Sequence, residues 1–105
     1  MDMEGLRKQL RVLSKRHSME VLRSIIEGPK YISQISEEMG IPFATAQQRV
    51  MELERAGLVE VVDRVDEASK RAVRMVRLLN FRVELSPRII SQLMGGRTEG
   101  ELRVS

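Results

Sequence analysis

Apolar residues recur at helical spacing through the first half of the chain, and this spacing predicts four helices. The first apolar stripe has members three or four residues apart: Met3, Leu6, Leu10 and Leu13. It predicts a helix over about residues 3–15. The same spacing predicts a second helix that begins at a Ser18 cap, a short third helix begun by Ser33, and a fourth over about 42–56. Glycines close the second, third and fourth of these segments, and Gly57 is placed for a left-handed C-cap.

After Gly57 the pattern changes to that of strands. Residues 58–65 and 71–79 are rich in β-branched and aliphatic side chains, and a polar loop separates them, which predicts a hairpin. Residues 80–85 alternate apolar and polar positions, which suggests either a third strand or an extended edge segment. Ser86-Pro87 then suits the cap and first residue of a last helix that reaches about residue 94.

The order of these elements predicts a fold class. A short extended step at Tyr31-Ile32 lies between the second and third helices, so the order is α-α-β-α-α-β-β-α. Two helices joined by a tight glycine turn and followed by a hairpin make a winged helix-turn-helix, a mainly α fold with a small β-hairpin (α+β). We expect one winged-helix domain over 1–96, with terminal dimerisation helices at about 3–15 and 87–94, and a flexible tail over 97–105.

Composition narrows the possible functions. The net charge of +3 and the pI of about 9.8 permit nucleic acid binding without demanding it. The chain has no Cys and one His, His17, so we expect no soft-metal site, no cofactor and no enzyme activity. No segment approaches about 20 consecutive apolar residues, so we expect no membrane association and a soluble, cytoplasmic protein.

A family resemblance supports the fold. The stretch ISQISEEMGIPFATAQQRVMELERAGLVEV resembles the central motif of ArsR-like winged-helix regulators, and LERAGLV, residues 53–59, fits their closing signature. Glu27-Gly28-Pro29-Lys30 is similar to the related HxlR type, and the MarR group is a neighbour. The resemblance spans about residues 6–79. It implies a transcriptional regulator that binds operator DNA as a dimer.

The predicted fourth helix begins with small, neutral side chains, which suit close docking in the major groove. A recognition helix contacts base edges with its N-terminal residues. The candidate base-reading residues are Ala44, Thr45, Gln47 and Gln48. The alternative interpretation is an ordinary polar helix surface. Pro42 stands where the family often has a capping side chain, so the cap passes to another group.

Basic residues nearby are candidates for phosphate contacts. They are Lys30, Arg49, Arg64, Lys70 and Arg71. Asp66 and Glu67 lie at the tip of the predicted hairpin, which is the wing of this fold, and their negative charges repel phosphate. We therefore expect the base of the hairpin, rather than its tip, near the duplex backbone.

Two apolar stripes at opposite ends of the chain suggest self-association, because a small monomer has little core with which to cover both. Their members are Leu6, Leu10, Leu13, Ile89, Ile90 and Leu93. The expected partners are double-stranded DNA and a second copy of the chain. A winged helix used as a protein-interaction module is the alternative. The sequence leaves open the operator, the regulated genes, the sign of regulation and any small-molecule effector.

Overall fold

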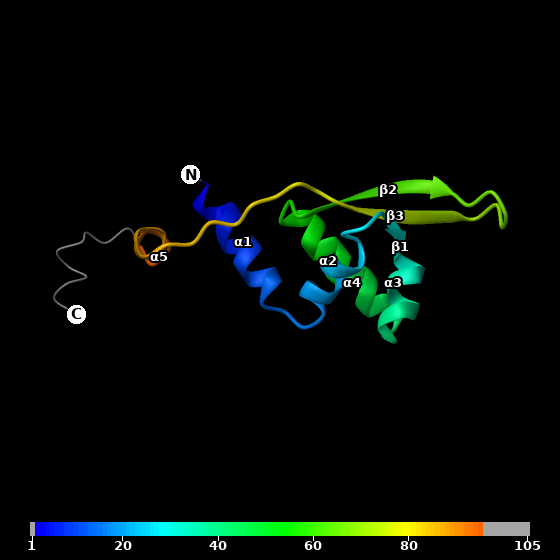
Figure 1. Ribbon diagram of the computed structural model, residues 1–105, viewed down its shortest axis with the longest axis horizontal. Helices are drawn as coiled ribbons and strands as arrows, with labels where there is room; N and C mark the ends of the chain where they lie inside the picture. Colours follow the sequence, from blue (N-terminus) through cyan, green and yellow to red (C-terminus); the bar gives the residue numbers. More distant parts are fainter. Residues whose placement is uncertain (1, 96–105) are drawn as a thin grey trace.

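The structure is a computed structural model that describes residues 2–95. These residues form the helices α1 (Met3–Leu13), α2 (Ser18–Ser24), α3 (Ile32–Met39), α4 (Phe43–Arg55) and α5 (Pro87–Leu93), and the strands β1 (Lys30–Tyr31), β2 (Val59–Val65) and β3 (Ala72–Leu78). The order matches the predicted one, and the fold is a winged helix-turn-helix (Figure 1). The tail predicted for 97–105 lies outside the described residues.

The sheet is antiparallel with the strand order β1-β3-β2. Val76 at the centre of β3 lies opposite Val61 of β2 on one side and Lys30 of β1 on the other. On the β1 side, only Val76 and Met75 of β3 are paired, because β1 has two residues. Residues 80–85 form no strand, and the third strand of the sheet is β1.

The core lies where α2, α3 and α4 meet the sheet. Ile35, Val50, Leu53 and Val76 have no exposed surface, and α3 packs closely against α4. The buried face of α4 consists of Ala46, Val50 and Leu53, whose spacing along the sequence places them on one side of a helix. One side of the recognition helix is therefore held rigidly, and the other side is left for solvent.

Left-handed glycines set the geometry in the turn of the helix-turn-helix and at its C-terminal end. Gly57 has φ +77°, its N–H donates to the carbonyl of Glu54, and the N–H of Leu58 donates to the carbonyl of Leu53. This pair of bonds is a Schellman motif, which satisfies the last carbonyls of α4 and turns the chain into β2. Gly40, with φ +64°, ends α3 in the same manner.

The helix starts partly differ from the predicted caps. Ser18 is the first residue of α2 and not its cap, because its hydroxyl donates instead to the carbonyl of Val12 at the end of α1. His17 takes the cap position with φ 75°. Ser86 does cap α5, since its Oγ accepts from the N–H of Ile89 at 3.2 Å and Pro87 follows.

The first and last helices contact each other within one chain. The guanidinium of Arg7 donates to the carbonyl of Leu93 at 2.7 Å. Leu6 and Ile89 are each only 7% exposed. Two of the six residues assigned to a dimer interface are thus already covered inside the monomer, because α5 returns to lie beside α1 (Figure 1). Within residues 2–95, no helix is both long and apolar enough to cross a membrane.

Candidate nucleic-acid interface

The first half of α4, residues 43–48, carries polar side chains that the fold does not use. We call it the leading half of α4. Ala44 and Gln48 are exposed, and Thr45 and Gln47 are partly exposed. Within residues 2–95, the side chains of Thr45, Gln47 and Gln48 make no hydrogen bond. Each therefore keeps its full hydrogen-bonding capacity for another molecule.

The hairpin of β2 and β3 is the wing of the fold. A hollow of about 460 Å³ lies between the leading half of α4, the start of α3 and the wing. We call it the α4–wing hollow. Its lining residues are Tyr31, Ile32, Ser33, Phe43, Gln47, Arg71, Ala72, Val73 and Arg74. It brings together one predicted base-reading residue, Gln47, and one predicted phosphate-binding residue, Arg71, from segments far apart in the sequence.

Sequence reasoning missed several residues of this hollow. Two of the three aromatic residues of the chain, Tyr31 and Phe43, line it, and Phe43 is 51% exposed. A large apolar side chain at the first turn of a recognition helix, off its buried stripe, could have marked Phe43. Ser33 and Arg74 join the hollow only through the pairing of β1 with β3, which local pattern does not predict.

The wing arginines point in different directions. Arg64 lies opposite Val73, and Asp63 lies opposite Arg74, so Arg64 and Arg74 project from opposite faces of the hairpin. The Arg74 face is the one that packs on the helices, because it carries the buried Val59 and Val76. Arg74 lies 3.7 Å from Asp63. Within the described residues, Arg64 and Arg71 make no ion pair.

The two lysines predicted to hold phosphate are paired with carboxylates. Lys30 lies 2.6 Å from Glu38 of α3, and Lys70 lies 3.4 Å from Glu67 at the wing tip. Both sites are solvent-accessible, and exposed pairs of this kind contribute little to stability. Either lysine would therefore share its ammonium group between its carboxylate partner and a phosphate.

Asp66 has a structural part in the wing turn. Its Oδ2 accepts from the hydroxyl of Ser69 at 2.7 Å and from the N–H of Ser69 at 3.2 Å. The hydroxyl and amide of Ser69 lower the pKa of the Asp66 carboxyl. The N–H of Asp66 donates to the carbonyl of Arg71 and closes the turn. This bond holds the backbone of Arg71 in position.

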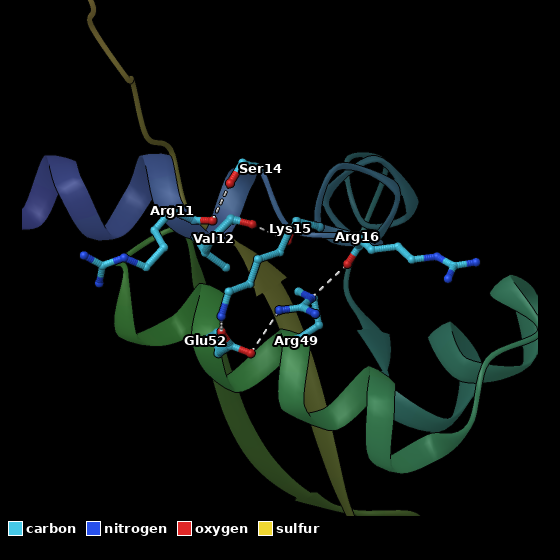
Figure 2. Close-up of polar contacts among 8 residues, drawn as sticks. Arg11, Val12, Ser14, Lys15, Arg16, Arg49 and Glu52 are labelled. Atoms are coloured by element: carbon cyan, nitrogen blue, oxygen red, sulfur yellow. Dashed lines mark hydrogen bonds and ion pairs between the residues drawn. The ribbon is translucent and has the colours of Figure 1, made fainter. Parts of the chain in front are cut away.

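The second half of α4, residues 49–55, is the trailing half, and it is tied to the rest of the domain (Figure 2). Arg49 donates to the carbonyl of Arg16 at 3.0 Å and to Glu52 at 2.9 Å, while Lys15 bonds the other oxygen of Glu52. The pKa of Glu52 is lowered, chiefly by the hydrogen bond from Lys15 and also by the positive charges of Arg49, Lys15 and Arg55. Burial acts in the opposite direction, but its effect is smaller than their sum.

This network changes the interpretation of Arg49. The sequence placed Arg49 on the shoulder of the helix for a phosphate contact. The structure turns its guanidinium toward the segment between α1 and α2, with a side chain only 14% exposed. The reason is tertiary, because the Arg16 carbonyl and Glu52 together offer two acceptors that no local pattern reveals.

Comparison with known families gives one match. Residues 13–62 match the model of a helix-turn-helix domain family, a range that runs from the end of α1 through most of β2. This match supports a helix-turn-helix regulator, and no curated protein matches the chain.

Proposed function

We propose that the protein is a sequence-specific, double-stranded DNA-binding transcriptional regulator of the ArsR-like type, with α4 in the major groove. The observation that carries the proposal is the unused polar capacity of the leading half of α4, where Thr45, Gln47 and Gln48 make no hydrogen bond within residues 2–95. A Gln side chain offers the donor and acceptor that adenine N6 and N7 require, and the Thr45 methyl suits thymine.

Phosphate contacts are assigned to the cations that the fold leaves unpaired near this helix. Arg71 shares the α4–wing hollow with Gln47, and Arg64 is exposed on the other face of the hairpin. Lys30 and Lys70 are secondary candidates, since each has a carboxylate neighbour. Arg49 positions α4 through Glu52 and Arg16, and does not need to touch DNA for this role.

We further propose a homodimer built on the terminal helices. Leu85, Ile90 and Met94 are 51%, 47% and 75% exposed, and they lie in or beside α5. Leu10 and Leu93 remain partly exposed in the same region. A two-fold dimer would present two recognition helices, so we expect a pseudo-palindromic site with half-sites roughly 10–10.5 base pairs apart.

The proposed function is tested by selecting bound sequences from random duplex DNA with the purified chain. Enrichment of a pseudo-palindrome supports it, with Gln48→Ala losing the preference at one position of each half-site. Enrichment of no sequence, together with no duplex binding at low salt, refutes it. In that case the protein-interaction module becomes the better interpretation, because exposed polar and aromatic groups can equally face a protein.

The dimer has its own test, which uses sedimentation equilibrium. Ile90→Glu places a charge on the exposed side of α5 and is expected to give a folded monomer. Met19→Glu is the matched control, because Met19 is 63% exposed on α2 and away from the terminal helices. A wild-type chain that sediments as a monomer at micromolar concentration contradicts the dimer.

A further inference from the structure

A second hollow lies at the other end of α4, where α1 runs alongside it. Lys8 and Arg11 lie three positions apart on α1 and so share one face of that helix, and Lys15 follows two residues after the helix ends. At the end of α4, the same spacing places Glu52, Arg55 and Ala56 on one side, and this side lines the hollow opposite α1. Together with Val12 they line a hollow of about 420 Å³, which we call the α1–α4 groove.

The groove has excess positive charge. It holds four cations, Lys8, Arg11, Lys15 and Arg55, and a single carboxylate, Glu52. Both oxygens of Glu52 are already engaged, one by Lys15 and one by Arg49. Within residues 2–95, Lys8, Arg11 and Arg55 make no ion pair or hydrogen bond through their side chains. Lys8 and Arg11 lie three residues apart on α1, so their like charges repel one another, and an anion bound between the walls of the groove would relieve this repulsion.

The floor of the groove is apolar and solid. Val12 is 4% exposed and belongs to the core, and Ala56 is 9% exposed. Gln9 donates to the carbonyl of Ala56 at 3.3 Å, which ties α1 to the end of α4. A concave site of this volume, with an apolar floor and a few convergent charged groups, has the dimensions and chemistry of a small-molecule site.

We propose that the α1–α4 groove binds a small organic anion, a carboxylate or phosphate monoester with a compact apolar body. Arg11 and Arg55, on opposite walls, supply forked donors for the anionic group, and Lys8 adds charge. Val12 and Ala56 cover the apolar part. Lys15 lies within the same groove, so the anion offers it a second acceptor beside Glu52.

A small anion suits this place better than the duplex backbone does. Gln47 and Ala56 are nine residues apart, which is roughly 13 Å along a helix, so the groove lies beyond the base-reading end of α4. Figure 2 shows Lys15, Glu52 and Arg49 converging between α1 and α4. The proposal does not depend on the proposed DNA-binding function, and it is tested without DNA.

The experiment is a titration of ¹⁵N-labelled protein at constant ionic strength with benzoate, phenyl phosphate and the uncharged benzamide. We expect saturable amide shifts confined to residues 8–15 and 52–56 with one or both anions, and none with benzamide. The two anions distinguish a carboxylate ligand from a phosphate ligand. Arg11→Gln and Arg55→Gln should each weaken binding roughly tenfold, as expected for one lost charge-assisted bond.

The control is Arg23→Gln, which removes the same charge from an exposed, unpaired site on α2 and should leave binding unchanged. Because Arg11 and Arg55 are exposed and lie on different helices, a folding defect in one variant leaves the other informative. The proposal is overturned by shifts that do not saturate, by groove shifts of equal size with benzamide, or by equal weakening in Arg23→Gln.

Discussion

The two halves of α4 belong to one continuous helix, yet they are used in opposite ways. In the leading half, Thr45, Gln47 and Gln48 make no hydrogen bond within residues 2–95. In the trailing half, Arg49 and Glu52 are bonded to the segment that follows α1, and Glu54 accepts from the N–H of Val61 in β2 at 3.2 Å. The polar groups of the trailing half hold the helix in place.

This difference between the two halves is what the proposed reading of bases by α4 requires. A side chain that reads a base has to be unengaged in the free protein but held at a defined place. The chain meets both needs on one helix, by anchoring the trailing half and leaving the leading half unbonded. The buried stripe of Ala46, Val50 and Leu53 runs through both halves and keeps them rigid with respect to each other.

The largest expected effect comes from breaking the shared stripe. Leu53 has no exposed surface, so Leu53→Ala should lower the free energy of unfolding by about 2–5 kcal/mol, through lost burial and the cavity left behind. Chemical denaturation measures it. Gln48→Ala in the leading half is the matched comparison and should stay within about 0.5 kcal/mol of wild type. Equal losses in both variants would abolish the distinction between the two halves.

The next effect concerns DNA affinity. Gln48→Ala should reduce discrimination at one base pair of each half-site by about 1–3 kcal/mol, because a donor and an acceptor to the base are lost. Competition binding with matched and mismatched duplexes measures the change. Met19→Ala on α2 is the control and should bind as wild type does, because Met19 is 63% exposed and is assigned neither to the duplex nor to the dimer. Unchanged discrimination in Gln48→Ala would remove this residue from the interface.

A smaller effect separates phosphate binding from base reading. Arg71→Gln should weaken binding to all duplexes alike and flatten the slope of log affinity against log salt by about one unit. The same substitution at Arg82, an exposed cation in the segment before α5, should leave the slope unchanged. A salt titration of both variants measures this. A loss of sequence preference in Arg71→Gln would mean that Arg71 reads a base instead.

The smallest effect is the pH dependence of the trailing half. Since the pKa of Glu52 is lowered in the folded protein, its ionised form adds stability above its ordinary pKa of about 4.5, and that stability is lost as pH falls through the folded value. Glu52→Gln should therefore lose less stability than wild type between about pH 6 and about pH 3.

The control for this pH dependence is Glu37→Gln, which removes an exposed carboxylate of α3 that makes no ion pair within residues 2–95. Its acid dependence should match that of wild type. If wild type and Glu52→Gln show the same acid dependence, the Lys15–Glu52–Arg49 network does not stabilise the fold.

Local physical rules account for the features that were predicted well. The order of elements follows from apolar periodicity, because burial of one helix stripe or one strand face requires that spacing. The Ser86-Pro87 start of α5 and the Gly57 end of α4 follow from backbone chemistry within four residues. Each depends on atoms that are close along the chain, so the sequence alone carries the information.

The candidate site was predicted only in part. Residues whose position depends on local helical spacing were found, and residues whose position depends on contacts between distant segments were missed. Helical periodicity was enough to place Thr45, Gln47 and Gln48 off the buried face of α4. Ser33 and Arg74 were missed, because they join the hollow only when β1 and β3 pair. Phe43 was also missed, although its place in the first turn of α4, off the buried face, is visible in the sequence.

By itself, then, the sequence determined the winged helix-turn-helix order, the buried stripe of α4 and the turns at Gly40 and Gly57, since all of these rest on local geometry and period. Tertiary structure decided the rest. It paired β3 with β1 in place of residues 80–85, covered Leu6 with a returning α5, and turned Arg49 inward to Glu52 and the Arg16 carbonyl. These outcomes depend on which acceptors, strand edges and apolar surfaces meet across long separations in sequence.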